Sequence, residues 1–248
     1  MTAAPALRLE AVSKRYARAS TPALCSLSFE APTGAVTALV GANGSGKSTL
    51  LRLLVGLLTP TDGRLEVLGS TPARGSPLMR RIGYVTADDR LCPELSVLDN
   101  LAYRACLRGV PPAQAPAAAR AGLERFGLGS LAPRRPAVLS AGERQRALLA
   151  ATLVHTPELL LLDEPSTALD ILAQSHLHAL LAEGPAGGRS VLMATHHLEE
   201  VWRLATHLIV LSAGRLVYAG PTRALAGSLA ELRRRLQTLF EEHAPCVA

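Results

Sequence analysis

Apolar residues near the start of the chain recur at the spacing of β-strands. The pattern is made by Leu7, Leu9, Leu24, Leu27 and Phe29. Turn signals at 20–22 (Ser-Thr-Pro) and 32–34 (Pro-Thr-Gly) separate and end these segments. The pattern predicts an antiparallel β layer at the beginning of the chain.

The next apolar run, 35–40 (AVTALV), is short and stops at a glycine-rich turn. Beyond this turn the period changes from that of a strand to that of a helix. The helical positions are Leu50, Leu51, Leu54, Val55 and Leu58. A strand, a loop and a helix are therefore expected in succession.

Helical spacing dominates from 96 to about 151, interrupted by Pro111-Pro112 and by a glycine- and proline-rich stretch at 127–136. We interpret this part as an inserted helical subdomain, at about 88–155. Apolar strands follow at 159–162, 190–195, 207–212 and 215–220.

Strands that alternate with helices imply a mostly parallel sheet, so the predicted fold class is α/β. The expected main domain covers 1–222, and the helical spacing of leucines beyond it predicts a short helical tail at 223–248.

Composition agrees with a large packed core. The 248 residues are 48% hydrophobic but only 3% aromatic, so Leu, Ala and Val must build the interior.

The longest apolar runs, such as 147–154, fall well short of the roughly 20 residues of a membrane-spanning helix. The first residues lack the basic flank and apolar stretch of a secretory signal. The four cysteines show no metal-like pairing and are expected to be reduced thiols. A cytoplasmic chain that does not cross a bilayer is the expectation.

The formal charge of +6 attracts any polyanion without choosing among them. Arginines stand in scattered pairs and in one cluster at 233–235, with no interleaved aromatic residues for base stacking. A solvated basic face is favoured over nucleic-acid binding, so no direct nucleic-acid partner is expected.

The sharpest local signal is GANGSGKST at 41–49, which follows a predicted strand and opens a helix. Its glycines let backbone N–H groups surround anionic oxygens, and the helix N-terminus adds partial positive charge. Lys47 is expected to reach the β- and γ-phosphates, and the Ser48 hydroxyl to ligate Mg²⁺. The residues expected to hold ATP here are Gly41, Asn43, Gly44, Ser45, Gly46, Lys47, Ser48 and Thr49.

A second signal is LLLLDE at 159–164, a buried strand that ends in two carboxylates. Parallel sheets place their ligands at this end of a strand. Asp163 is expected to hold Mg²⁺, directly or through water, and Glu164 to polarise an attacking water. The alternative is a strand that ends in ordinary surface acids, and the preceding phosphate-binding motif weakens that alternative.

The block LSAGERQRALLAATLVHTPELLLLDEPSTALD at 139–170 resembles the signature and Walker B region of ABC ATPases, and the resemblance runs from about Leu7 to Gly220. Within the signature, alanine replaces the middle glycine and glutamate replaces the glutamine. The resemblance implies that Ser140 and the Gly142 amide reach the γ-phosphate held by the Lys47 of a second subunit. It also places Asp170, in a D-loop, at the same interface. A helix N-cap at Ser140 with Glu143 as its capping-box partner is an alternative that is compatible with this role.

Three further positions are judged by the same resemblance. His196, at the end of a strand, is similar to the family's switch histidine, although His197 stands beside it and register alone decides between them. Tyr16 is similar to the aromatic residue that stacks on adenine, its alternative being an anchor for the β layer. The family's Q-loop glutamine is missing, because Ala87 stands in its place and Asp88 or Asp89 would have to act through a water.

The resemblance implies an ATPase in which two cassettes, as a homodimer or with a paralogous partner, close on two Mg-ATP molecules. Separate transmembrane permease subunits are the expected partners, with the chain peripheral at the inner face of the membrane. The short C-terminal tail and the 198–220 segment lean toward an exporter. The alternatives are a soluble non-transport ABC ATPase and a weakly hydrolysing regulatory cassette. A simple P-loop kinase would leave the signature, the D-loop and the histidine unexplained.

Overall fold

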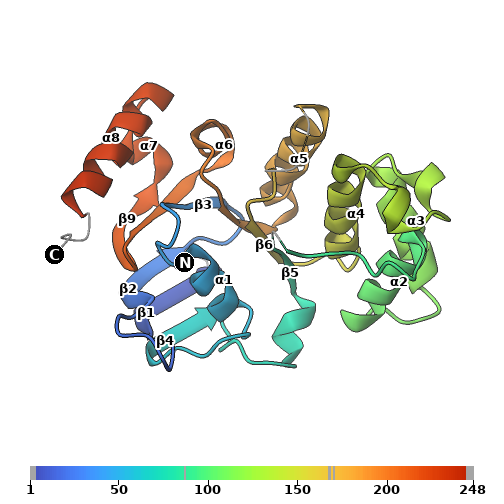
Figure 1. Ribbon diagram of the computed structural model, residues 1–248, viewed down its shortest axis with the longest axis horizontal. Helices are drawn as coiled ribbons and strands as arrows, with labels where there is room; N and C mark the ends of the chain where they lie inside the picture. The colour runs from blue at the N-terminus through green and yellow to red at the C-terminus, as the bar shows by residue number, and fades with distance from the viewer. Residues whose placement is uncertain (1–3, 87, 167–168, 170, 244–248) are drawn as a thin grey trace.

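The computed structural model describes residues 4–86, 88–166, 169 and 171–243. It contains a three-stranded sheet, a six-stranded sheet and a separate group of helices (Figure 1). The helical group and the C-terminal helix α8 lie at opposite ends of the long axis (Figure 1). No helix in the described ranges is both long and apolar enough to cross a membrane.

The smaller sheet is antiparallel and has the order β2–β1–β4. Its strands are β1 (Leu7–Lys14), β2 (Leu24–Ala31) and β4 (Asp62–Val67). The predicted antiparallel layer is therefore confirmed. Its third strand, β4, comes later in the sequence, after the helix that follows the glycine-rich turn.

The larger sheet has the order β5–β6–β7–β3–β8–β9. The neighbours from β5 to β8 pair in parallel, and β9 is antiparallel to β8. Its strands are β3 (Val36–Gly41), β5 (Ile82–Val85), β6 (Leu159–Asp163), β7 (Ser190–Ala194), β8 (His207–Ser212) and β9 (Arg215–Pro221). The predicted α/β class with a mostly parallel sheet is confirmed.

Both faces of the larger sheet are covered, which explains its continuous apolar strands. In β6, Leu159 and Leu161 pack into the core shared with α1 (Lys47–Leu54) and the smaller sheet. Leu160 and Leu162 point to the opposite face, toward the core that includes α5 (Ile171–Glu183). The alternation of strand side chains thus lets one strand serve two cores.

The separate group of helices has an apolar core of its own, built by α2, α3, α4 and the loops between them. Its helices are α2 (Val97–Leu107), α3 (Ala115–Arg125) and α4 (Ala141–Leu153). Leu101, Leu123 and Leu128 are almost fully buried in this core. Helix α4 also contacts β5, which joins this group to the larger sheet.

The last helices pack on the far end of the larger sheet (Figure 1). They are α6 (Leu198–Leu204), α7 (Thr222–Leu225) and α8 (Leu229–Glu242). Leu232 and Leu236 of α8 are buried in the same cluster as strand β8. The Arg223 guanidinium lies 3.2 Å above the ring centroid of Trp202, which joins α7 to α6.

Candidate functional site

Three neighbouring strands of the larger sheet end at one edge and carry the predicted chemistry there. β3 leads into the glycine-rich turn, β6 ends in Asp163, and β7 is followed by His196. A cavity of about 240 Å³ lies at this edge. It is lined by Ala23, Asn43, Gly44, Gly46, Lys47, Ser48, Thr49, Asp163 and Glu164. The structure therefore brings the two sharpest sequence signals to one cavity.

The glycine-rich turn runs too close to its neighbours for larger residues. Gly46 has a φ of +103°, and a Cβ there would lie 2.5 Å from Leu24 Cδ2. A Cβ on Gly41 would collide with the Ser45 hydroxyl and with a backbone carbonyl of β8. Helix α1 begins directly after Gly46, so its first N–H groups have no carbonyl of the same helix to bind. This is the arrangement that binds phosphate.

The Lys47 ammonium lies inside the turn. Its Nζ donates hydrogen bonds to the Gly41 carbonyl at 2.7 Å and to the Ala42 carbonyl at 3.2 Å. The residue is only 8% exposed. The buried Ser45 hydroxyl has no hydrogen-bond partner among the described residues. The turn thus holds a positive charge and an unused polar group, both of which suit an anionic ligand.

Ser48 and Asp163 form the predicted metal-binding pair. The Ser48 hydroxyl donates to Oδ2 of Asp163 at 2.9 Å. Burial raises the pKa of the Asp163 carboxyl above its ordinary value, and the hydrogen bond from Ser48 opposes this shift. A hydroxyl and a carboxylate oxygen are donors that Mg²⁺ accepts. The two side chains therefore fit the Mg²⁺ that the sequence implies.

Glu164 stands beside His196 at the adjacent strand end. Its backbone has a φ of +51°, a left-handed value that is unusual for a residue with a side chain. Its Oε2 lies 2.8 Å from His196 Nδ1, and the His196 side chain is 58% exposed against 20% for Glu164. The rings of His196 and His197 have centroids 4.1 Å apart. The atomic contact to Glu164 is made by His196, the residue that register favours.

A buried network that sequence reasoning missed supports this loop. Thr195 Oγ1 donates to Glu200 Oε2 at 3.1 Å, and the other oxygen of Glu200 lies 3.2 Å from His178 Nε2. Thr195 Oγ1 also accepts a bond from the backbone N–H of His197. Glu200 is 5% exposed. The sequence carries no signal for this network, because His178 comes from a separate helix, α5.

Tyr16 lies at the rim, next to the end of the glycine-rich turn. Its hydroxyl is 3.2 Å from the Thr49 hydroxyl, and the residue is 38% exposed. An exposed aromatic face near the phosphate-binding turn is suited to a planar base. The structure thus brings Tyr16 to the turn, 33 residues further along the chain.

Ser140 and Gly142 do not line this cavity. Ser140 caps the N-terminus of α4: its hydroxyl accepts from the Glu143 N–H at 3.2 Å, and its own N–H donates to Glu143 Oε2 at 2.7 Å. The hydrogen bond from the Ser140 backbone lowers the pKa of Glu143. The capping-box alternative is thus present in the structure. Asp170 lies outside the described residues.

Gln145 links helix α4 to the segment that follows β6, and sequence reasoning missed it. Its Nε2 donates to the Pro165 carbonyl at 3.2 Å, directly after Glu164. A glutamine among the polar residues in the first half of α4 gives no indication of a partner 20 residues away.

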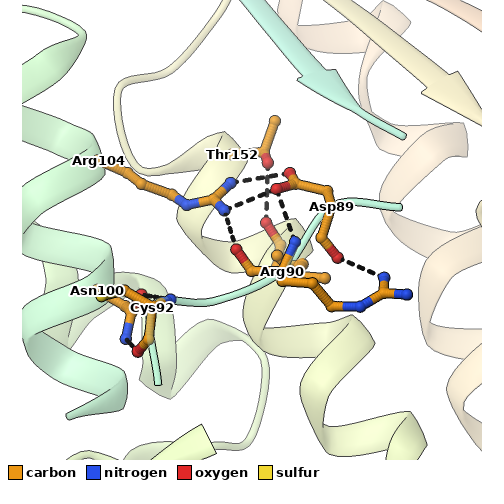
Figure 2. Close-up of polar contacts among 7 residues, drawn as sticks. Asp89, Arg90, Cys92, Asn100, Arg104 and Thr152 are labelled. Atoms are coloured by element: carbon orange, nitrogen blue, oxygen red, sulfur yellow. Dashed lines mark hydrogen bonds and ion pairs between the residues drawn. The ribbon is translucent and has the colours of Figure 1, made fainter. Parts of the chain in front are cut away.

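The region of the missing glutamine contains a second unforeseen contact. Ala87 lies outside the described residues. Asp89 forms two hydrogen bonds of 2.8 and 2.9 Å with the Arg104 guanidinium, which also donates to the Arg90 carbonyl (Figure 2). Both side chains of the pair are about one quarter exposed, at 24% and 23%. The Asp89 carboxylate is therefore engaged with α2, which disfavours it as the water-mediated substitute for glutamine.

Comparison with known proteins identifies the family. A family model described as "ABC transporter" matches residues 24–167, more than half of the chain. The chain belongs to the ABC transporter family of ATP-binding proteins. The resemblance that was read from the signature and Walker B block is confirmed, and the chain is an ATPase of this family.

Relatives of nearly the same length strengthen the assignment to the ABC family. The nickel import ATP-binding protein NikO of Rhodobacter capsulatus is 41% identical, and the alignment covers 97% of this chain and 99% of NikO. A solved structure described as an ATP-binding subunit of an ABC transporter has a TM-score of 0.84 and 27% identity, with 96% and 99% covered. A dimeric ATP-binding cassette bound to ADP and Pi, with a TM-score of 0.79 and 24% identity, supports the ABC fold.

The lean toward an exporter is not supported. Import predominates in the names of the similar ABC proteins, which include taurine and methionine import ATP-binding proteins beside NikO. The short tail and the 198–220 segment carried that lean. Helix α8 packs against β3, α6 and β8.

Proposed function

We propose that this ATP-binding subunit hydrolyses ATP in a composite site that two copies of the chain, or the chain and a paralogue, build together. The observation that carries the proposal is the meeting of the Ser48–Asp163 and Glu164–His196 pairs at the end of the phosphate-binding turn. The signature residues Ser140 and Gly142 stand outside the cavity, which supports their assignment to the site of a second subunit.

The roles proposed for the side chains follow from their positions. Lys47 exchanges its bonds to turn carbonyls for bonds to the β- and γ-phosphates. Ser48 and Asp163 hold Mg²⁺, which neutralises phosphate charge when bound. Glu164 polarises the attacking water, and His196 contacts the γ-phosphate. In-line phosphoryl transfer to water needs positioning and charge neutralisation more than covalent chemistry, and these groups supply both.

Separate transmembrane permease subunits are the proposed partners, with the chain at the inner face of the membrane. A cavity of about 510 Å³ lies between α2 and the segment after β5. Tyr103 and Leu107 of α2 line it and are 55% and 63% exposed. Residues four apart share a helix face, so this apolar pair offers one contact surface. Replacement of both by serine is expected to abolish co-purification of the permease without loss of ATP binding.

The direction that the relatives favour is import. The 41% identity to NikO over 97% of the chain supports this direction. The transported substrate is selected by the membrane subunits, whose residues are not part of this chain. Growth dependence on candidate substrates after deletion of the gene tests the direction.

The central experiment measures Mg²⁺-dependent ATPase activity across protein concentrations, beside Glu164→Gln. Activity is expected to rise faster than linearly, and the variant to be inactive yet to form ATP-dependent dimers by light scattering. Glu158→Gln, at the opposite end of β6, is the matched control and should keep the activity. ATP binding without hydrolysis or dimers in the native chain would favour the regulatory-cassette alternative.

A further inference from the structure

Three potential metal ligands gather where β6 and β7 end. Glu164, His196 and His197 each offer one nitrogen or oxygen atom, and these atoms lie within 4.8 Å of one another. Within the described ranges this is the one group of three or more His, Cys, Asp or Glu side chains with such spacing. It is distinct from the Ser48–Asp163 pair proposed for Mg²⁺.

The distances suit a shared ion. Glu164 Oε2 and His196 Nδ1 are 2.8 Å apart. In the tetrahedral arrangement usual for Zn²⁺, two ligands with bonds of roughly 2.1 Å stand about 3.4 Å apart. Ligand atoms as far apart as 4.8 Å would therefore approach one another by about 1.4 Å on this bond length. The His197 side chain makes no capping bond to α6, so no bond of that kind has to break for the adjustment.

The Glu164 carboxylate lacks a good partner. Its Oε2 is shielded from solvent and makes no hydrogen bond to the described residues, although it lies 2.8 Å from His196 Nδ1. A shielded carboxylate oxygen without a hydrogen bond is unfavourable. A cation between the oxygen and the two imidazoles would remove this deficit.

The donor set selects the class of ion. Two imidazoles and one carboxylate are ligands of Zn²⁺ and of neighbouring transition metals, whereas Mg²⁺ prefers oxygen ligands alone. We propose that the nucleotide-free chain binds one divalent transition-metal ion, such as Zn²⁺, at Glu164, His196 and His197. Because the ion occupies the groups proposed to face water and the γ-phosphate, it inhibits ATP hydrolysis. This consequence rests on the proposed function, whereas the binding itself does not.

The test is calorimetric titration of the nucleotide-free chain with Zn²⁺ in the presence of millimolar Mg²⁺. One ion is expected per chain. His197→Ala should raise the dissociation constant for Zn²⁺ at least tenfold. Because His197 has no proposed part in hydrolysis, the variant should keep its Mg²⁺-dependent ATPase activity. Its half-inhibiting Zn²⁺ concentration should rise by the same factor.

Cys92→Ser is the control, because the exposed Cys92 thiol lies 3.1 Å from a Glu94 carboxylate oxygen and is the rival zinc ligand. Zinc binding that survives His197→Ala but is lost in Cys92→Ser overturns the inference, as does the absence of saturable binding. Zinc binding that depends on His197 in a chain without ATPase activity would leave the metal site standing and refute the proposed hydrolysis. An active chain without zinc binding would refute the metal site alone.

Discussion

The Ser48 hydroxyl donates a 2.9 Å hydrogen bond to the Asp163 carboxylate across a sequence separation of 115 residues. The bond joins the helix after the phosphate-binding turn to the end of a buried strand. It holds two oxygen donors at the distance at which one small cation can bind both.

Removal of this hydroxyl should separate metal binding from nucleotide binding. We expect Ser48→Ala to lower Mg²⁺-dependent ATPase activity at least tenfold, because one ligand is lost and the half-buried Asp163 loses its hydrogen bond. Ser48→Thr keeps the hydroxyl and should keep most of the activity. ATP binding measured in EDTA should change little in either variant. Equal losses of ATPase activity in Ser48→Ala and Ser48→Thr would contradict the assigned role.

Tyr16 offers a test of base stacking. Tyr16→Ala is expected to raise the dissociation constant of ATP roughly tenfold, since loss of one base–aromatic stack costs about 1–3 kcal/mol. Tyr16→Phe removes only the contact to the Thr49 hydroxyl and should bind ATP like the native chain. If both variants bind normally, Tyr16 serves the β layer instead. Fluorescent ATP analogues provide the measurement.

The capping and phosphate-contact roles of Ser140 can be separated by substitution. Ser140→Ala should lower both ATPase activity and the free energy of unfolding, the latter by about 1 kcal/mol, because the cap is lost. Ser140→Asp keeps a capping oxygen but brings a negative charge to the proposed γ-phosphate contact. We expect this variant to be as stable as the native chain in urea titration and to be inactive in ATPase assays. A stable and active Asp variant would limit Ser140 to capping.

The Asp89–Arg104 pair should matter for stability more than for chemistry. Asp89→Asn is expected to lower the free energy of unfolding by about 1–3 kcal/mol, because a partly buried guanidinium loses its charged partner. The double variant with Arg104→Met should recover part of the loss. Glu30→Gln, which breaks the exposed pair with Arg8, is the control and should have a much smaller effect. Urea titration of the native chain, Asp89→Asn, Arg104→Met and the double variant gives the coupling energy.

His155 should make stability depend on pH. Burial, followed by the nearby Arg108 charge, lowers the pKa of His155 to about 4. The unfolded chain then binds more protons between about pH 6.5 and pH 4, so stability falls as pH falls through this window, by on the order of 1 kcal/mol. His155→Asn should flatten the slope of unfolding free energy against pH. His243→Asn should leave that slope unchanged.

Much of the fold and the nucleotide cavity could be predicted because their signals are local. The glycine-rich turn, the Leu159–Asp163 strand and the helical spacing after residue 96 each lie within a short stretch. Parallel strands then bring their ends together by topology alone.

The contacts that escaped prediction join distant segments through ordinary residue types. Arg104 and Asp89 are 15 residues apart, and Glu200 reaches His178 across 22. Neither pair differs in sequence from exposed charges on helices, because only packing decides which charges meet. The lean toward an exporter found no support for another reason, since it was drawn from the tail and the 198–220 segment and not from residues that contact a membrane subunit.

The Arg223–Trp202 stack gives the molecule a built-in optical reporter. Trp202 is the single tryptophan of the chain and stands on α6, which begins two residues after His196. Indole emission is sensitive to a cation held 3.2 Å above the ring. Any shift of α6 against α7 that follows occupancy of the neighbouring loop will therefore change the emission of one fluorophore, without a label and without mutation.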